Sequence, residues 1–165
     1  MGYIAFFDIL WYNIRYIAQK GVFFMTCTFF GHRNADSKTK ELLKKHIIIL
    51  IEERKVDTFY VGNNGNFDYY AQRVLQELKI ERSDFKYYVI LSYINEKALS
   101  GDQATTLFPE ELENCVPRFA ICKRNNWLIN RSSFLLAYSK HTLSNSSKWI
   151  AAAQKRGLKV INLAD

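Results

Sequence analysis

Two short polar segments carry the residue types in this sequence that are best suited to holding a phosphate. Each directly follows a run of β-branched and aromatic residues, and they read Gly31-His32-Arg33 and Gly62-Asn63-Asn64-Gly65-Asn66-Phe67-Asp68. Glycine leaves room for a ligand beside the backbone, and a turn that leads into a helix points free N–H groups at an anion. We therefore expect both segments to bind a phosphate or a nucleotide.

Two side chains in these segments have alternative roles that the sequence leaves open. His32 could donate to a phosphate or act as an acid or base near neutral pH, or it could pack against the neighbouring loop and order it. Asp68 falls in the first turn of the helix that Asn66 is expected to cap. It could stabilise the helix dipole or accept hydrogen bonds from a ribose.

A third group of candidates lies on a helix expected from Pro117 to about Arg131. At 100° per residue, Arg118 and Asn125 fall on one face with the apolar residues Ile121, Cys122, Leu128 and Ile129. A polar side chain on a buried face is costly unless it has a partner. We expect Arg118 to reach a ligand, with a buried ion pair to Asp68 or Glu113 as the alternative. Asn125 is expected to be structural and Arg124 to be a solvated charge.

The order of the expected elements predicts the fold that positions these residues. Strands are expected at 26–30, 57–61, 86–93, 134–138 and 159–163, with helices between them. This alternation is typical of an α/β protein, here a Rossmann-like three-layer sandwich with a mostly parallel sheet of about five strands. The loops that follow the first, second and fourth strands, the last of which begins at Ser139, would then share one edge of the sheet.

Two other helices have apolar stripes that should face this sheet. One runs from Asp36 or Ser37 to about Arg54, and its stripe is Leu42, Leu43, His46, Ile49 and Leu50. The other begins near Asn66, and its stripe is Phe67, Tyr70, Ala71, Val74, Leu75 and Leu78. A polar loop at 95–109 is longer than most connections in a compact domain, which is typical of lids and mobile segments.

Composition limits the class of partner. The chain has 165 residues and a formal net charge of +7, which favours anionic ligands. Its basic residues are spread along the chain, so a nucleic-acid groove is a secondary expectation. The three cysteines, Cys27, Cys115 and Cys122, lack metal-ligand spacing and fit a reducing cytoplasm. We expect no metal and no cofactor, and the sequence leaves homo-oligomer formation open.

Residues 1–24 differ from the rest of the chain and are expected to be an N-terminal extension of doubtful status. They are rich in aromatic residues, yet no apolar run reaches the ~20 residues that a membrane span needs. They also lack the basic region and cleavage site of a signal peptide. The alternatives are an interfacial amphipathic helix and a stretch outside the native protein, whose start would be Met25. Residues 25–165 are expected to form a single domain.

These features together resemble the SLOG superfamily of Rossmann-like proteins, which includes DprA and the LOG phosphoribohydrolases. The resemblance covers residues 25–165. It rests on the two glycine segments, on Pro117-Arg118-Phe119-Ala120 leading to Arg124-Asn125-x-Trp127, and on the runs Phe134-Leu135-Leu136-Ala137-Tyr138 and Val160-Ile161-Asn162-Leu163. It implies phosphate contacts at Gly31, Arg33, Gly62 and Gly65, a sugar near Asp68, and Arg118 reaching in from the side.

The sequence departs from relatives in this superfamily at two places. It has no Pro-Gly-Gly-x-Gly-Thr-x-x-Glu motif, which supplies the catalytic glutamate of the LOG enzymes, and it has Ser144-Asn145-Ser146-Ser147 where relatives often have a Gly-Gly turn. The leading hypothesis is therefore a domain that binds a nucleotide or nucleotide-derived ligand as a sensor or sequestering protein.

Two other functions stay open at this point. One is a nucleotide N-glycosidic-bond hydrolase, for which Asp68 is the best candidate carboxylate. The next candidates are Glu110, Glu111 and Glu113. The other is single-stranded DNA binding, whose affinity would fall steeply with salt. Whether the chain is an enzyme is not decided by its sequence.

Overall fold

The computed structural model describes residues 24–94 and 105–165. Residues 1–23 of the expected N-terminal extension at 1–24 and most of the expected loop at 95–109 lie outside these residues. The described residues form an α/β sandwich of the Rossmann type, as the alternation of strands and helices predicted.

A six-stranded sheet forms the middle layer, and every neighbouring pair of strands in it is parallel. The strands are β1 (Met25–Gly31), β2 (Val56–Val61), β3 (Lys86–Ile90), β4 (Thr106–Leu107), β5 (Phe134–Tyr138) and β6 (Lys159–Asn162). Their order is β4-β3-β2-β1-β5-β6. The sequence predicted five of them. It missed β4 because two residues are too short for an alternating pattern to show.

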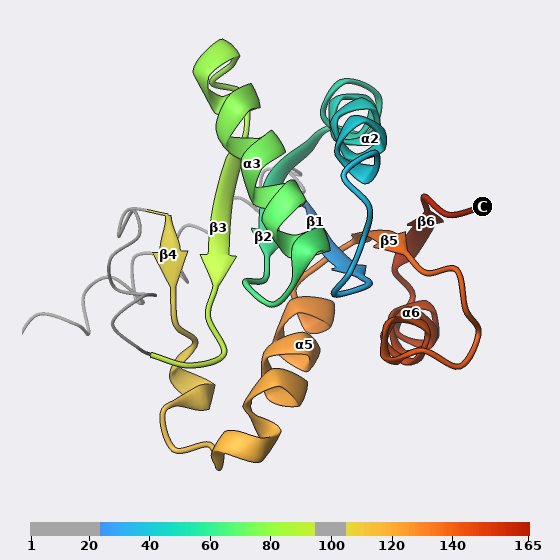
Figure 1. Cartoon of the computed structure of the whole chain (residues 1–165). Helices are drawn as coiled ribbons and strands as arrows, with labels where there is room; N and C mark the ends of the chain where they lie inside the picture. Colours follow the sequence, from blue (N-terminus) through green and yellow to red (C-terminus); the bar gives the residue numbers. More distant parts are fainter. Residues whose placement is uncertain (1–23, 95–104) are drawn as a thin grey trace, which may run out of the picture.

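Helices cover both faces of the sheet (Figure 1). On one face lie α2 (Thr39–Arg54) and α3 (Asn66–Glu81), and on the other lie α5 (Ala120–Asn130) and α6 (Asn145–Arg156). Successive residues of a strand point to opposite faces. Accordingly, Phe29 of β1 packs in the apolar core beneath α2 and α3, and Phe30 packs in the core beneath α5 and α6.

The apolar stripe of α2 is rotated from the one that the sequence predicted. Leu43 and Leu50 are buried as expected, but Ile47 is buried in place of His46, and Leu42 is exposed. His46 is half-buried and its Nδ1 lies 2.8 Å from the carbonyl oxygen of Leu42. The run of five apolar residues at 47–51 fits more than one phase of a helix, which is why periodicity alone misplaced the stripe.

The stripe of α3 follows the prediction closely. Its predicted residues are buried except Tyr70, which is half-buried. The helix starts one residue earlier than expected, because Asn66 is its first residue and Gly65 occupies the cap position with φ 103°. A positive φ is a conformation that glycine adopts without strain.

The helix that carries Arg118 is also different from the prediction. Residues Pro117–Phe119 form a short 3₁₀ turn, and the α-helix proper begins at Ala120. A 3₁₀ turn has 3.0 residues per turn, so counting 100° per residue from Arg118 gives the wrong phase. Arg118 and Cys122 are exposed, whereas Arg124, expected to be solvated, is buried together with Asn125.

Among the described residues, no helix is long and apolar enough to cross a membrane. Cys27 is buried in β1, as expected for a strand in the middle of the sheet. No group of three or more histidine, cysteine or acidic residues in the described part of the chain could hold a metal ion.

Candidate functional site

The structure brings the two glycine segments together at the carboxyl ends of β1 and β2. The N–H of Asn66 donates to the carbonyl oxygen of Arg33 at 2.8 Å. Gly65 lies directly against Arg33, since a Cβ atom added at Gly65 would be 2.7 Å from the Cα of Arg33. The tight contact and the positive φ both require glycine at this position.

The N-terminus of α3 opens onto this edge of the sheet. Gly65, the cap residue of α3, has no side chain to bond the first turn, whereas at α6 the Ser144 hydroxyl accepts from the N–H of Ser147. Apart from the N–H of Asn66, which donates to the Arg33 carbonyl oxygen, the first turn of such a helix points N–H groups and the positive end of the helix dipole outward. The start of this 16-residue helix is therefore well suited to an anion.

A buried ion pair lies beside Gly62, the first residue after β2. Asp68 comes from α3 and Arg124 from α5, and Arg124 Nη1 is 3.9 Å from Asp68 Oδ2. A Cβ atom added at Gly62 would overlap both the guanidinium and the carboxylate. The absence of a side chain at Gly62 thus makes the space in which the two charges meet.

Two donors of the Arg124 guanidinium have no acceptor among the described residues. The residue is 3% exposed, and neither its Nε nor its Nη1 has a hydrogen-bond partner within residues 24–94 and 105–165. An arginine stays charged in proteins, and a buried charge without hydrogen bonds costs several kcal/mol. Sequence reasoning missed Arg124, although it lies four residues before the buried Leu128 and so on the same helix face.

Burial dominates the electrostatics of this pair. It raises the pKa of Asp68, while Arg124 and the N–H of Asn64, which donates to Asp68 Oδ2 at 2.9 Å, oppose that rise. Burial likewise lowers the pKa of Arg124, against the attraction of Asp68. Both pKa shifts favour the neutral form of the group. The reason is that an ion pair at 3.9 Å without a hydrogen bond only partly offsets the loss of water around each charge.

Polar groups around Gly62 hold its loop in place. Gln72 Nε2 donates to the carbonyl oxygen of Gly62 at 2.7 Å, and Asn64 Nδ2 donates to the hydroxyl of the buried Ser92 at 3.3 Å. Asn125 is buried with an Oδ1 that lacks a donor in the described structure. This oxygen is thus a buried group without a partner in the residue that follows Arg124. The hydrogen bond to a strand end that a structural role for Asn125 would require is not seen in the described structure.

The loops after β1 and β5 meet at the point where the strand order reverses, which is where ligands bind in open α/β sheets. The N–H of His32 donates to the carbonyl oxygen of Tyr138 at 3.2 Å, and the N–H of Lys140 donates to His32 Nε2 at 2.9 Å. The His32 ring also lies edge-on to Tyr138. The structure thus places His32 against the neighbouring loop, which was one of its two expected roles.

The remaining predicted site residues lie around this edge with fewer contacts. Gly31 packs under the ring of Phe67, and Asn63 is exposed. The hydroxyl of Ser139 lies 3.0 Å from those of Ser144 and Ser147, inside a network that the protein itself satisfies. Arg118 is exposed with its guanidinium 4.7 Å from the ring of Phe119. The structure therefore does not place Arg118 on the buried face from which it was expected to reach a ligand.

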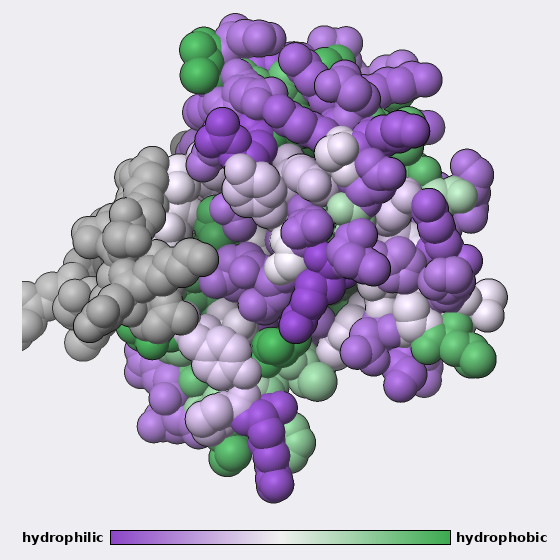
Figure 2. Space-filling view, viewed as in Figure 1, coloured by the Kyte–Doolittle hydropathy of each residue, from purple (hydrophilic) through white to green (hydrophobic). Residues whose placement is uncertain are grey.

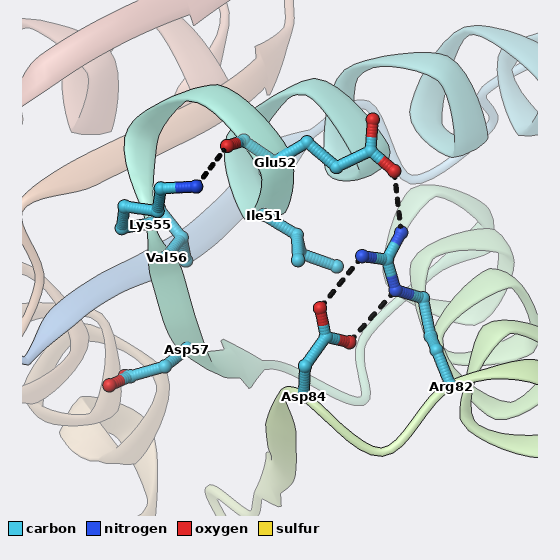
Figure 3. A pocket seen from close by; sticks show the side chains of 7 residues that line it. All are labelled: Ile51, Glu52, Lys55, Val56, Asp57, Arg82 and Asp84. Carbon is cyan, nitrogen blue, oxygen red and sulfur yellow. Dashed lines mark hydrogen bonds and ion pairs between the residues drawn. The ribbon is translucent and has the colours of Figure 1, made fainter.

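A hollow at the opposite end of β2 is a separate feature (Figure 3). It lies between the ends of α2 and α3, and Arg82 there forms ion pairs with Glu52 at 3.0 Å and Asp84 at 2.7 Å. Lys55 Nζ donates to the carbonyl oxygen of Glu52. Because these charges already have partners and lie at the amino ends of the strands, the hollow does not resemble a ligand site.

The face shown in Figure 2 is mostly polar, with apolar side chains scattered among charged ones. Large contiguous apolar patches are the usual mark of a protein-docking surface, whereas single exposed apolar residues are normal. This face therefore suits a polar or charged ligand better than an apolar partner.

No protein-family model and no curated protein sequence significantly matches this chain. Among solved structures, the chain is similar to DNA processing protein A (DprA) from Streptococcus pneumoniae, with a TM-score of 0.63 and 15% identity. The match covers 84% of this chain and 50% of the DprA chain, so this chain spans about half the length of that protein. At this identity, the likeness shows a shared Rossmann-like fold.

Proposed function

We propose that the protein binds a nucleotide or nucleotide-derived ligand at the carboxyl ends of β1, β2 and β5, as a sensor or sequestering domain. The ligand phosphates would lie over Gly31, Gly62 and Gly65, near the uncapped N-terminus of α3. The resemblance of the sequence to the SLOG superfamily and the DprA-like fold both support membership of that group, in which such a ligand is expected.

The observation that carries this proposal is the buried Arg124 guanidinium with unpaired donors. Buried polar groups in proteins nearly always have hydrogen-bond partners, and an exception often marks the place of a bound ion or ligand. A phosphate or another oxyanion above Gly62 would supply acceptors for Nε and Nη1, and hydrogen bonds between an ionised donor and an ionised acceptor are the strong ones. We therefore assign Arg124, in addition to Arg33, to anion binding.

Mass spectrometry of small molecules released from freshly purified protein tests the proposal. Wild type should release a species with a phosphate or diphosphate group, and Arg124→Met should lose it. Loss of hydrogen bonds to a charged group costs about 1.5–3 kcal/mol, or roughly 10- to 150-fold in affinity. Arg73→Met, which removes an exposed arginine from α3, is the matched control and should keep the ligand.

A folding defect must be separated from loss of binding. Arg124→Met leaves Asp68 buried without a counter-charge, so the double variant Arg124→Met/Asp68→Asn provides a neutral site of similar shape. Both variants should fold and both should lack the ligand. An unchanged ligand in the folded double variant would overturn the proposal, and so would a wild type that releases nothing and binds neither ADP nor ADP-ribose.

Turnover is a second candidate function, and the position of Asp68 favours it. Its carboxylate is next to Arg124, where a ribose attached to a bound phosphate would lie, and burial raises its pKa towards that of a useful acid. Incubation with AMP and assay for free adenine tests it. Asp68→Asn should abolish adenine release while AMP is still bound, and the absence of release by wild type would exclude this chemistry for AMP.

A further inference from the structure

His32 joins the two loops that flank the reversal of strand order. It follows β1, yet its imidazole Nε2 accepts the backbone N–H of Lys140, in the loop after β5, at 2.9 Å. We propose that neutral His32 is a positioning residue that latches these two loops, so that the loop after β5 is held beside the candidate site while His32 is unprotonated. The latch itself is independent of the ligand, whereas its effect on affinity rests on the proposed function.

The direction of this hydrogen bond fixes the protonation state. A backbone N–H can only donate, so Nε2 must present its lone pair, and any proton on the neutral ring is on Nδ1. Protonation of Nε2 would set two N–H groups against each other. The bond from Lys140 would then be lost, while the bond from the His32 N–H to the Tyr138 carbonyl oxygen would remain.

The groups that face His32 also disfavour its protonation. The ring of His141 is 5.7 Å away between centroids, and the Lys140 ammonium lies over the ring of Tyr138, which packs edge-on against His32. Burial, then His141, then Lys140 lower the pKa of His32 below its usual value of 6.5. Asp36 is the acidic group nearby, and it interacts with Lys140.

The lowered pKa of His32 determines how the stability of the folded protein changes with pH. The pKa of His32 is lower in the folded protein than in the unfolded chain, so the latch contributes stability at pH values above about 6.5. That contribution is lost as the pH falls from 6.5 through the lowered pKa. A histidine that contacted a phosphate directly would behave in the opposite way, because an anion favours the protonated ring.

Nuclear magnetic resonance tests the latch without a ligand. The amide resonance of Lys140 and the ring nitrogens of His32 should titrate with one shared midpoint below pH 6.5 in wild type. His32→Gln places an amide oxygen near the position of Nε2, so in this variant the Lys140 amide should lose the titration that follows His32. His141→Gln should keep the latch and raise the midpoint. A Lys140 amide that does not follow His32, or that titrates equally in His32→Gln, would overturn the proposal.

Calorimetry with ADP-ribose then separates this inference from the proposed function. The charge of ADP-ribose is constant between about pH 5 and pH 8, so its affinity reports the protein alone. Wild-type affinity should fall with decreasing pH by up to about tenfold per pH unit, the limit for one linked proton, and His32→Gln should show no such fall. Tighter binding by wild type at low pH would refute the latch. Absence of binding at every pH, with Lys140 still following His32, would instead refute ADP-ribose as the ligand and leave the latch standing.

Discussion

Asp68 and Arg124 come from opposite helical layers of the sandwich, yet their side chains approach to 3.9 Å past the end of β2. Asp68 belongs to α3 and Arg124 to α5, and the sheet separates these helices along most of its length. The two side chains can meet because β2 ends at Val61 and the next residue, Gly62, has no side chain. This relationship makes Gly62 the residue on which the candidate site depends.

Substitution of Gly62 by alanine should therefore damage the site through a steric clash. The new Cβ would overlap the Arg124 guanidinium and the Asp68 carboxylate, and overpacking of this kind costs about 1–3 kcal/mol. Chemical denaturation measures this loss. Gly157→Ala is the control, because Gly157 has φ 94° but open space around it, so its cost of about 1 kcal/mol comes from the backbone alone. Equal losses in the two variants, with ligand binding intact in both, would contradict the steric argument.

The ion pair should show strong coupling in a double-mutant cycle. Asp68→Asn and Arg124→Met each leave one buried charge alone, which typically costs about 3–5 kcal/mol, while the double variant removes both charges. We expect the double variant to be more stable than the sum of the two single losses predicts. The pair formed by the exposed Glu52 and the half-buried Arg82 is the control, with an expected coupling below about 1 kcal/mol. Additive losses at Asp68 and Arg124 would show that the pair does not interact.

The cysteines should differ sharply in reactivity. Burial raises the pKa of Cys27 far above its usual value, so this thiol stays protonated and inaccessible in the folded protein. Cys122 is exposed on α5 and should react readily with a thiol reagent at mildly alkaline pH. Peptide mapping after brief labelling should find Cys122 modified and Cys27 unmodified until denaturant is added. Early labelling of Cys27 would contradict its place in the middle of the sheet.

The fold was predictable because its signals are local and repeated. Five of the six strands coincide with runs rich in β-branched and aromatic residues, and the apolar stripe of α3 fits a single phase of the helix. The glycine segments were predictable for the same reason, since glycines between a strand and a helix are themselves a local signal of a tight turn. Among the strands of the described sheet, only the two-residue β4 lacked any such signal.

The buried ion pair of the candidate site was not predictable from periodicity. Its two charges, Asp68 and Arg124, are far apart in the sequence and meet only through the packing of opposite layers. The 3₁₀ turn at Pro117–Phe119 changed the angle of Arg118 relative to α5, so that Arg118 was wrongly placed inward, whereas Arg124 was expected outward because its charge was taken as solvated, although it shares a helix face with Leu128. A change of helix type at a proline alters the direction of the residues in that turn relative to the α-helix that follows, and sequence periodicity does not reveal it.

The most direct test of the central claim observes Arg124 itself. In ¹⁵N-labelled protein, the Nε–Hε resonance of Arg124 and the backbone amides of Gly62 and Gly65 can be followed during titration with ADP-ribose. If the ligand supplies the missing acceptors, all three resonances should shift along one saturating curve, and the Nε–Hε proton should become protected from exchange with water. Saturable binding that leaves the Arg124 resonance unchanged would contradict the assignment of this buried arginine to anion binding.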